Sequence, residues 1–95
     1  MLFDTNLTQA NLKKAVLHNA RMEKAQLAGT NLEGAFLQGA TLILANLAEA
    51  DLTGADLSDA DLLGANLKDA KVSKEQLGKT KNLQGALMPD GSKHE

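Results

Sequence analysis

Residues 50–64 read ADLTG-ADLSD-ADLLG, so one five-residue pattern of small, polar, Leu and two variable residues occurs three times in succession. Outward from this stretch, Leu occupies every fifth position from residue 2 to residue 72, with only Met22 and Val72 as substitutes. From residue 5 onward, the position two before each of these is Ala or Thr. Residues 5–74 therefore form fourteen complete five-residue units in one register.

A period of five fits neither a continuous helix nor a continuous strand. On an α-helix, successive Leu residues would step by roughly 140° and cover every side of the axis. On a strand, an odd period sends alternate Leu side chains to opposite faces. The repeat works if each unit is a short extended piece followed by a turn, with Leu and the preceding small residue facing a central axis. The remaining three positions then face solvent.

The second position after each Leu is where a type II turn requires a positive φ. Six corners hold residues that accept this conformation, namely Asn19, Gly29, Gly34, Gly39, Gly54 and Gly64. Longer side chains resist a positive φ, so a different turn is expected at the other seven. These are Gln9, Lys14, Lys24, Leu44, Glu49, Asp59 and Asp69.

The undiluted units Ala50-Asp51-Leu52-Thr53-Gly54 and Ala60-Asp61-Leu62-Leu63-Gly64 resemble the pentapeptide-repeat protein family. The resemblance covers residues 2–74 and implies an all-β solenoid, a right-handed quadrilateral β-helix with four units per coil and about three and a half coils. The ending LQGALMPDGS, residues 83–92, is similar to the tails of small cyanobacterial members. We therefore expect residues 1–74 to form the β-helix.

Residues 75–95 are expected to cap the upper end of the solenoid. Ser73-Lys74-Glu75-Gln76 has the form of a capping box and predicts a short α-helix that ends near Gly78. Leu77, Leu83, Leu87 and Met88 are the predicted packing groups of this helix and loop cap, and residues 89–91 a turn. Residues 92–95 are expected to be a disordered tail.

Composition excludes several classes of function. The chain has 95 residues, a formal net charge of −2, no Cys and two aromatic residues, Phe3 and Phe36. No strong field favours nucleic acid or a membrane surface, and thiolate metal sites and disulfides are excluded. Two isolated histidines, His18 and His94, suggest no catalytic or metal pair. We expect a soluble cytoplasmic protein with no catalytic residues, cofactor, metal or small-molecule substrate.

Candidate binding residues are apolar side chains at outward positions. When the outward positions are sorted by a twenty-residue coil, Val16, Phe36, Ile43, Leu44 and Leu63 are predicted to form a patch for a protein partner or a second copy. The alternatives are that the C-terminal tail covers part of it or that these are scattered surface groups. Leu2 and Phe3 are a candidate end-to-end contact, unless Phe3 folds over and closes the shaft.

Acidic residues gather between residues 49 and 69, where Lys68 is the only cation. The band consists of Glu49, Asp51, Asp56, Asp59, Asp61 and Asp69. It raises the alternative of a regulatory DNA mimic that binds a topoisomerase-like or other nucleic-acid-binding protein. The competing explanation is that Asp and Asn before each Leu bind nearby turn backbone. The sequence favours a non-catalytic structural or interaction module, whose partner is an unidentified protein or the protein itself.

Overall fold

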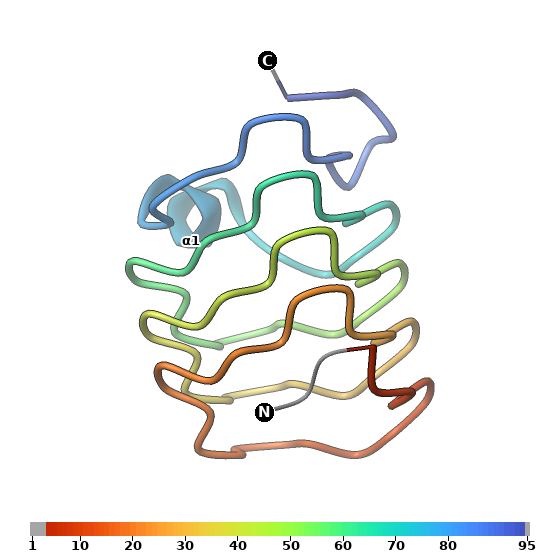
Figure 1. Cartoon of the computed structure of the whole chain (residues 1–95), viewed down its shortest axis with the longest axis vertical. Helices are drawn as coiled ribbons and strands as arrows, with labels where there is room; N and C mark the ends of the chain where they lie inside the picture. Colours follow the sequence, from red (N-terminus) through yellow and green to blue (C-terminus); the bar gives the residue numbers. More distant parts are fainter. Residues whose placement is uncertain (1–3, 95) are drawn as a thin grey trace.

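The protein, described over residues 4–94 by a computed structural model, winds into a stack of four-sided coils (Figure 1). Single parallel bridges join residues that lie twenty positions apart. One side of the stack shows the register: Asn6 pairs with Gln26, Gln26 with Asn46, and Asn46 with Asn66. Twenty residues make one coil of four pentapeptides, as predicted.

Backbone hydrogen bonds between coils hold each side and each corner in place. At one side, Leu27 N donates to Asn46 O at 2.7 Å, and Asn46 N donates to Ala25 O at 3.0 Å. At the next corner, Gly29 N donates to Ala48 O at 2.8 Å. The coils therefore form parallel β-ladders on every side, although each extended piece is only a few residues long.

The shaft is filled by the repeated Leu and Ala side chains, as the spacing of five predicts. Leu side chains at every fifth position from 27 to 67 are at most 2% exposed, and Met22 takes the same role. Thr30 is also buried, and its Oγ1 donates to Leu7 O at 2.8 Å. Each buried Leu contributes about 2 kcal/mol.

The prediction that seven corners adopt a different turn is wrong. The corners that hold a residue other than glycine have the same left-handed backbone as the glycine corners. The φ angle is 59° at Leu44 and 62° at Glu49, against 66° at Gly64. The N–H of each such residue must reach the next coil, as when Leu44 N donates to Leu63 O at 2.8 Å. The ladder imposes this conformation even though it costs about 1–2 kcal/mol for a residue with a side chain.

Asn and Asp residues before the central Leu bind the turn that follows, which confirms the prediction for these positions. Asn46 Oδ1 accepts from Ala48 N at 3.0 Å, and Asp61 Oδ1 accepts from Leu63 N at 3.1 Å. The same bond occurs at Asn6, Asn11, Asn31, Asp51, Asp56, Asn66 and Asn82. The polar outer positions therefore stabilise the corners.

The helix α1, Lys74–Gly78, interrupts the repeat at one side of the stack (Figure 1). Its capping box is formed as predicted: Ser73 Oγ accepts from Gln76 N, and Gln76 Oε1 accepts from Ser73 N. Gln76 Nε2 also donates to Leu52 O at 2.7 Å and Ala55 O at 2.8 Å. The helix thereby supplies donors to carbonyls of the coil below. Within residues 4–94, no helix has the length and apolar character needed to cross a membrane.

After α1 the chain returns to the ladder, which the sequence pattern did not predict. Asp61 pairs with Asn82 and Asn66 with Leu87, a spacing of twenty-one residues, so the segment that contains α1 inserts one residue into the repeat. Leu87 therefore takes an outward position, while Ala86 is buried and Leu83 and Met88 pack against the core. The expected packing role of Leu87 is wrong.

Residues 92–94 fold back on this last coil and pair with it. Met88 N donates to Ser92 O at 2.7 Å, Lys93 forms an antiparallel bridge with Leu87, and His94 N donates to Ala86 O at 2.8 Å. Asp90 Oδ1 accepts from both Ser92 N and Ser92 Oγ, which turns the chain back. The expected disorder is wrong for residues 92–94, and Glu95 lies outside the described residues.

Candidate protein-binding surface

The predicted apolar patch separates into two parts in the structure. Val16 and Phe36 are joined by a parallel bridge and are 67% and 45% exposed. Leu44 is 52% exposed and lies at a different corner, one side of the coil further along the chain. Ile43 and Leu63 lie at that same corner in successive coils and are half-buried. Leu2 and Phe3, the predicted end contact, lie outside the described residues.

Val16 and Phe36 form the apolar part of a shallow, open hollow of about 620 Å³. The hollow extends from this pair to the adjacent corner, where His18, Asn19, Gln38, Gly39 and Asp59 complete its lining. Glycine is required at position 39 because the amide oxygen of Asn19, one coil below, occupies the space that a Cβ would take. The name Val16–Phe36 face is used below for this hollow and its lining residues.

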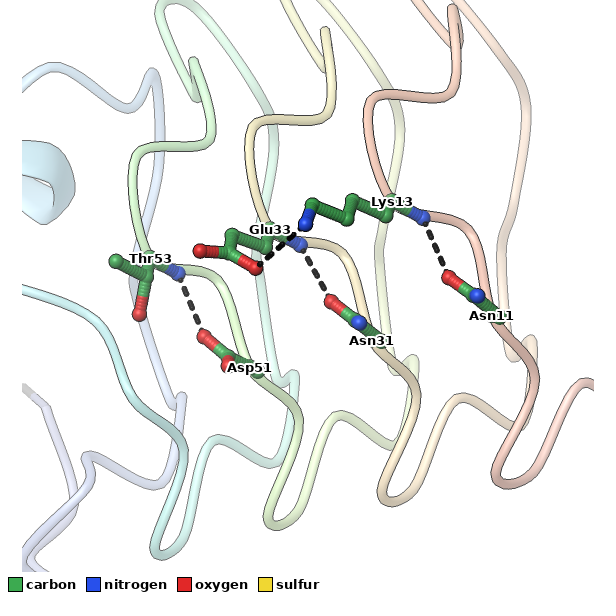
Figure 2. A network of polar contacts seen from close by, with 6 residues as sticks. All are labelled: Asn11, Lys13, Asn31, Glu33, Asp51 and Thr53. Atoms are coloured by element: carbon green, nitrogen blue, oxygen red, sulfur yellow. Dashed lines mark hydrogen bonds and ion pairs between the residues drawn. The ribbon is translucent and has the colours of Figure 1, made fainter.

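Val16 and Phe36 differ from the Asn and Asp residues that hold most of the equivalent outward positions. On the preceding side of the coils, Asn11, Asn31 and Asp51 lie above one another. The side chain of each accepts a hydrogen bond from the backbone N–H two residues later (Figure 2). An ion pair of 3.7 Å between Lys13 Nζ and Glu33 Oε1 adds to that polar surface (Figure 2).

Val16 and Phe36 occupy the position of these Asn and Asp residues but have no side-chain acceptor for the turn. Each gives up a hydrogen bond of about 0.5–1.5 kcal/mol and exposes apolar surface instead. Val16 and Phe36 therefore stabilise their turns less than an Asn or Asp does at the same position of the repeat.

Gln38 is a feature of this face that the sequence did not single out. Its Nε2 donates to Asp56 Oδ2 in the next coil at 2.9 Å, while its Oε1 is covered and has no hydrogen-bond partner among the described residues. A covered acceptor without a donor costs about 1–3 kcal/mol. No pattern of residue types predicts this, because it depends on how the amide is held by the coil above.

The predicted acidic band does not form one surface. Its members lie on different sides and corners of the stack, with Asp51 above Asn31 and Asp56 above Phe36. Bonds to Ser58 Oγ and to Ser58 N hold the pKa of Asp56 below its usual range. Bonds to Thr53 lower the pKa of Asp51 in the same way. This distribution gives no support to the DNA-mimic alternative.

The titratable side chains of the face are not arranged as a pair or a cluster. His18 and Asp59 both line the hollow, but among residues 4–94 no hydrogen bond or ion pair joins them. Nor do the described residues include a group of three or more His, Cys, Asp or Glu side chains placed to hold a metal ion. The face offers apolar area, a carboxylate, an imidazole and amide groups.

The exposed Leu44, in the second part of the predicted patch, has a role in packing. The Leu44 side chain lies over Gly64 in the next coil, where it fills the space that a Cβ at position 64 would take. Gln9 covers Gly29 and Asn19 covers Gly39 in the same manner. Since the side chain of one corner packs on the glycine of the next, Leu44 belongs to the packing of its corner.

Comparison with known proteins agrees with this architecture. The profile of pentapeptide repeats matches eight copies over residues 2–39 and 40–74. No match was found among curated proteins. The solved pentapeptide repeat protein Rfr23 from the cyanobacterium Cyanothece 51142 is 35% identical, with a TM-score of 0.76 over 99% of this chain and 60% of that one. The pentapeptide repeat protein alr5209 from Nostoc Pcc 7120 is 38% identical, with a TM-score of 0.71 over 87% of this chain and 64% of that one.

A more distant structure is a pentapeptide repeat protein from the thylakoid lumen of Arabidopsis thaliana. It is 27% identical, with a TM-score of 0.58 over 95% of this chain and 69% of that chain. The present chain thus spans about three fifths of the length of the two cyanobacterial proteins. Its match to the repeat profile and its quadrilateral β-helix show that the chain belongs to the pentapeptide repeat family.

Proposed function

We propose that this protein is a non-catalytic interaction module and that its Val16–Phe36 face binds a protein partner. Pentapeptide repeat proteins are in general non-enzymatic structural or interaction modules. The observation that supports this particular face is the adjacent pair of exposed apolar residues, Val16 and Phe36, at a repeat position that in most units holds a turn-stabilising Asn or Asp. Surface that stabilises the fold less than its equivalents is a feature of binding sites.

The rigid ladder favours binding by a preformed surface. Phe36 N donates to Ala15 O at 2.9 Å and Leu37 N to Asp56 O at 2.9 Å, so the backbone of the face is held from both neighbouring coils. A partner therefore loses little free energy in ordering this side of the contact. An exposed aromatic ring in a defined hollow is also the kind of residue that dominates interface energetics.

The size of the face indicates a transient contact. The molecule measures 28 by 21 by 21 Å, so one side offers at most about 600 Å², which is less than the roughly 800 Å² per partner of a standard interface. We expect a dissociation constant in the micromolar range unless the partner also covers a second side.

Photo-cross-linking in the source cells tests the proposal. The photoreactive analogue of phenylalanine, p-benzoylphenylalanine, is placed at position 36, with a matched control at position 26. Gln26 is exposed, occupies the same position of its repeat, and lies on another side of the same coil. We expect a discrete adduct from position 36 and none from position 26. An adduct of twice the mass identifies a second copy as the partner. No adduct from position 36, or the same adducts from both positions, would refute the proposal.

A further inference from the structure

We infer that the segment bound by the Val16–Phe36 face presents an apolar side chain next to a lysine or arginine, and that Asp59 binds the cation. This inference rests on the proposed function and adds the chemistry of the partner. It follows from what lies at the two ends of the hollow, which are unlike each other.

One end of the hollow is apolar and open. Val16 and Phe36 lie in successive coils, joined by a parallel bridge. The coil above continues this column with Asp56, whose carboxylate is engaged by Ser58 and Gln38. The apolar area is therefore bounded by a satisfied polar group and has room for one aliphatic or aromatic side chain.

The other end of the hollow carries an available carboxylate. Asp59 is exposed, and its backbone is fixed because Asp59 N donates to Lys79 O at 2.9 Å. Among residues 4–94 the ion pairs are Lys13 with Glu33 and Arg21 with Glu23, so the Asp59 carboxylate has none. Lys79 lies above Asp59 in the next coil, but among residues 4–94 no ion pair joins their side chains. Asp59 is therefore the carboxylate of this face that is left for an external cation.

The accessible carboxylate selects a donor. Asp59 offers its exposed carboxylate at the edge of the hollow, whereas Gln38 Oε1 is covered and out of reach of a bound segment. A lysine ammonium or an arginine guanidinium supplies donors and no acceptor. An exposed carboxylate beside an apolar hollow therefore favours a cationic segment, and it disfavours a phosphate or a carboxylate because Asp59 and Asp56 would repel it.

Titration of the isotope-labelled 95-residue chain with short synthetic peptides, followed by amide chemical shifts, tests the inference. The probe is acetyl-Gly-Ser-Leu-Arg-Ser-Gly-amide, and its two controls carry Ser in place of Leu or Glu in place of Arg. We expect saturable shifts at Phe36, Gln38, Gly39 and Asp59 with the probe alone. Affinity should be in the millimolar range for so small a peptide and should fall as salt is raised.

Variants of the protein separate the cation site from the rest of the face. Asp59→Asn should weaken the probe about two- to five-fold, the usual range for an exposed ion pair, while Asp69→Asn should change nothing. Asp69 is a matched control because it is exposed, has a φ of 61° against 59° at Asp59, and lies at another corner of the same coil. Asn is well tolerated at such a backbone position.

Several outcomes would overturn the inference. Equal binding of the Arg and Glu peptides, an unchanged affinity in Asp59→Asn, or an absence of shifts at millimolar peptide would each do so. Shifts of the same amides with protein concentration alone would identify a second copy as the occupant and would also overturn it. In any of these cases an adduct from position 36 would leave the proposed function standing, so the two failures can be told apart.

Discussion

Gln76→Glu is the substitution whose effect follows most closely from the geometry at the end of the repeat. Glutamate preserves the capping box, since its carboxylate can still accept from Ser73 N. It removes the amide donor that reaches Leu52 O at 2.7 Å and Ala55 O at 2.8 Å, and it places a carboxylate oxygen against two carbonyl oxygens instead. The variant therefore isolates the contact between α1 and the coil below.

The expected loss of stability can be worked out from these two bonds. Each is worth about 1 kcal/mol, so the free energy of unfolding at pH 7 should fall by about 2 kcal/mol or more. For a domain of this size, this corresponds to a fall in Tm of roughly 8–16 °C. Thermal unfolding followed by far-UV circular dichroism measures it. Gln84→Glu is the control, because Gln84 is exposed and its substitution should change stability by no more than about 0.5 kcal/mol.

The pH dependence gives the same prediction a second readout. Two carbonyl oxygens facing the carboxyl group of Gln76→Glu should raise its pKa in the folded state above the unfolded value of about 4.3. A pKa raised in the folded state means that the fold favours the protonated carboxyl group over the charged one. The loss of stability caused by Gln76→Glu should therefore be complete at pH 7 and shrink as the pH falls towards 4. If Gln76→Glu unfolds at the wild-type temperature at pH 7, Gln76 does not hold α1 on the coil.

The other predictions concern the core, the outer turns and the binding face. Leu47→Ala should cost about 2–5 kcal/mol in urea unfolding because Leu47 is fully buried, whereas Leu44→Ala should cost much less; equal costs would contradict the inward assignment. Because hydrogen bonds to Ser58 depress the pKa of Asp56 in the fold, its contribution is present above about pH 4 and lost as pH falls below it, so the wild type should lose more stability than Asp56→Asn between pH 5 and about 3. Val16→Asn should leave the urea midpoint almost unchanged, since a regained turn bond offsets a little lost apolar burial; a large fall would show that Val16 serves the fold.

Most of the architecture was predictable because it depends on one periodic requirement. A Leu at every fifth position has only one way to face a common axis, and Asp or Asn before Leu has a turn N–H within reach wherever the repeat occurs. The family resemblance then supplied the four-sided coil. The capping box at Ser73 and Gln76 was equally visible, because both partners lie within four residues.

The wrong predictions concern contacts between coils, which the pattern within a single repeat does not reveal. Leu44 resists a positive φ by itself, but its N–H is needed by Leu63 O, and Gly64 makes room for its side chain. Leu87 was assigned to the core because it is apolar, whereas the one-residue insertion at α1 turned it outward. Position at the chain end predicts disorder for residues 92–94, but these residues pair with the last coil because the chain has returned to the ladder.

The candidate site was predictable only in part. Apolar residues at polar positions identified Val16 and Phe36, but the twenty-residue sorting also joined them to Leu44, which packs on a glycine one side away. The hollow at Gly39 and the unpaired Gln38 Oε1 depend on where side chains from neighbouring coils lie, and no spacing rule contains that.

The central claim is that the Val16–Phe36 face serves binding rather than folding. The most direct test is the yield of cross-linked partner from p-benzoylphenylalanine at position 16, measured for the otherwise unaltered chain and for Phe36→Asn, together with the thermal unfolding of both proteins. The account predicts that Phe36→Asn still unfolds in one cooperative transition and that its adduct disappears. A folded Phe36→Asn variant that gives the adduct in undiminished yield would contradict it.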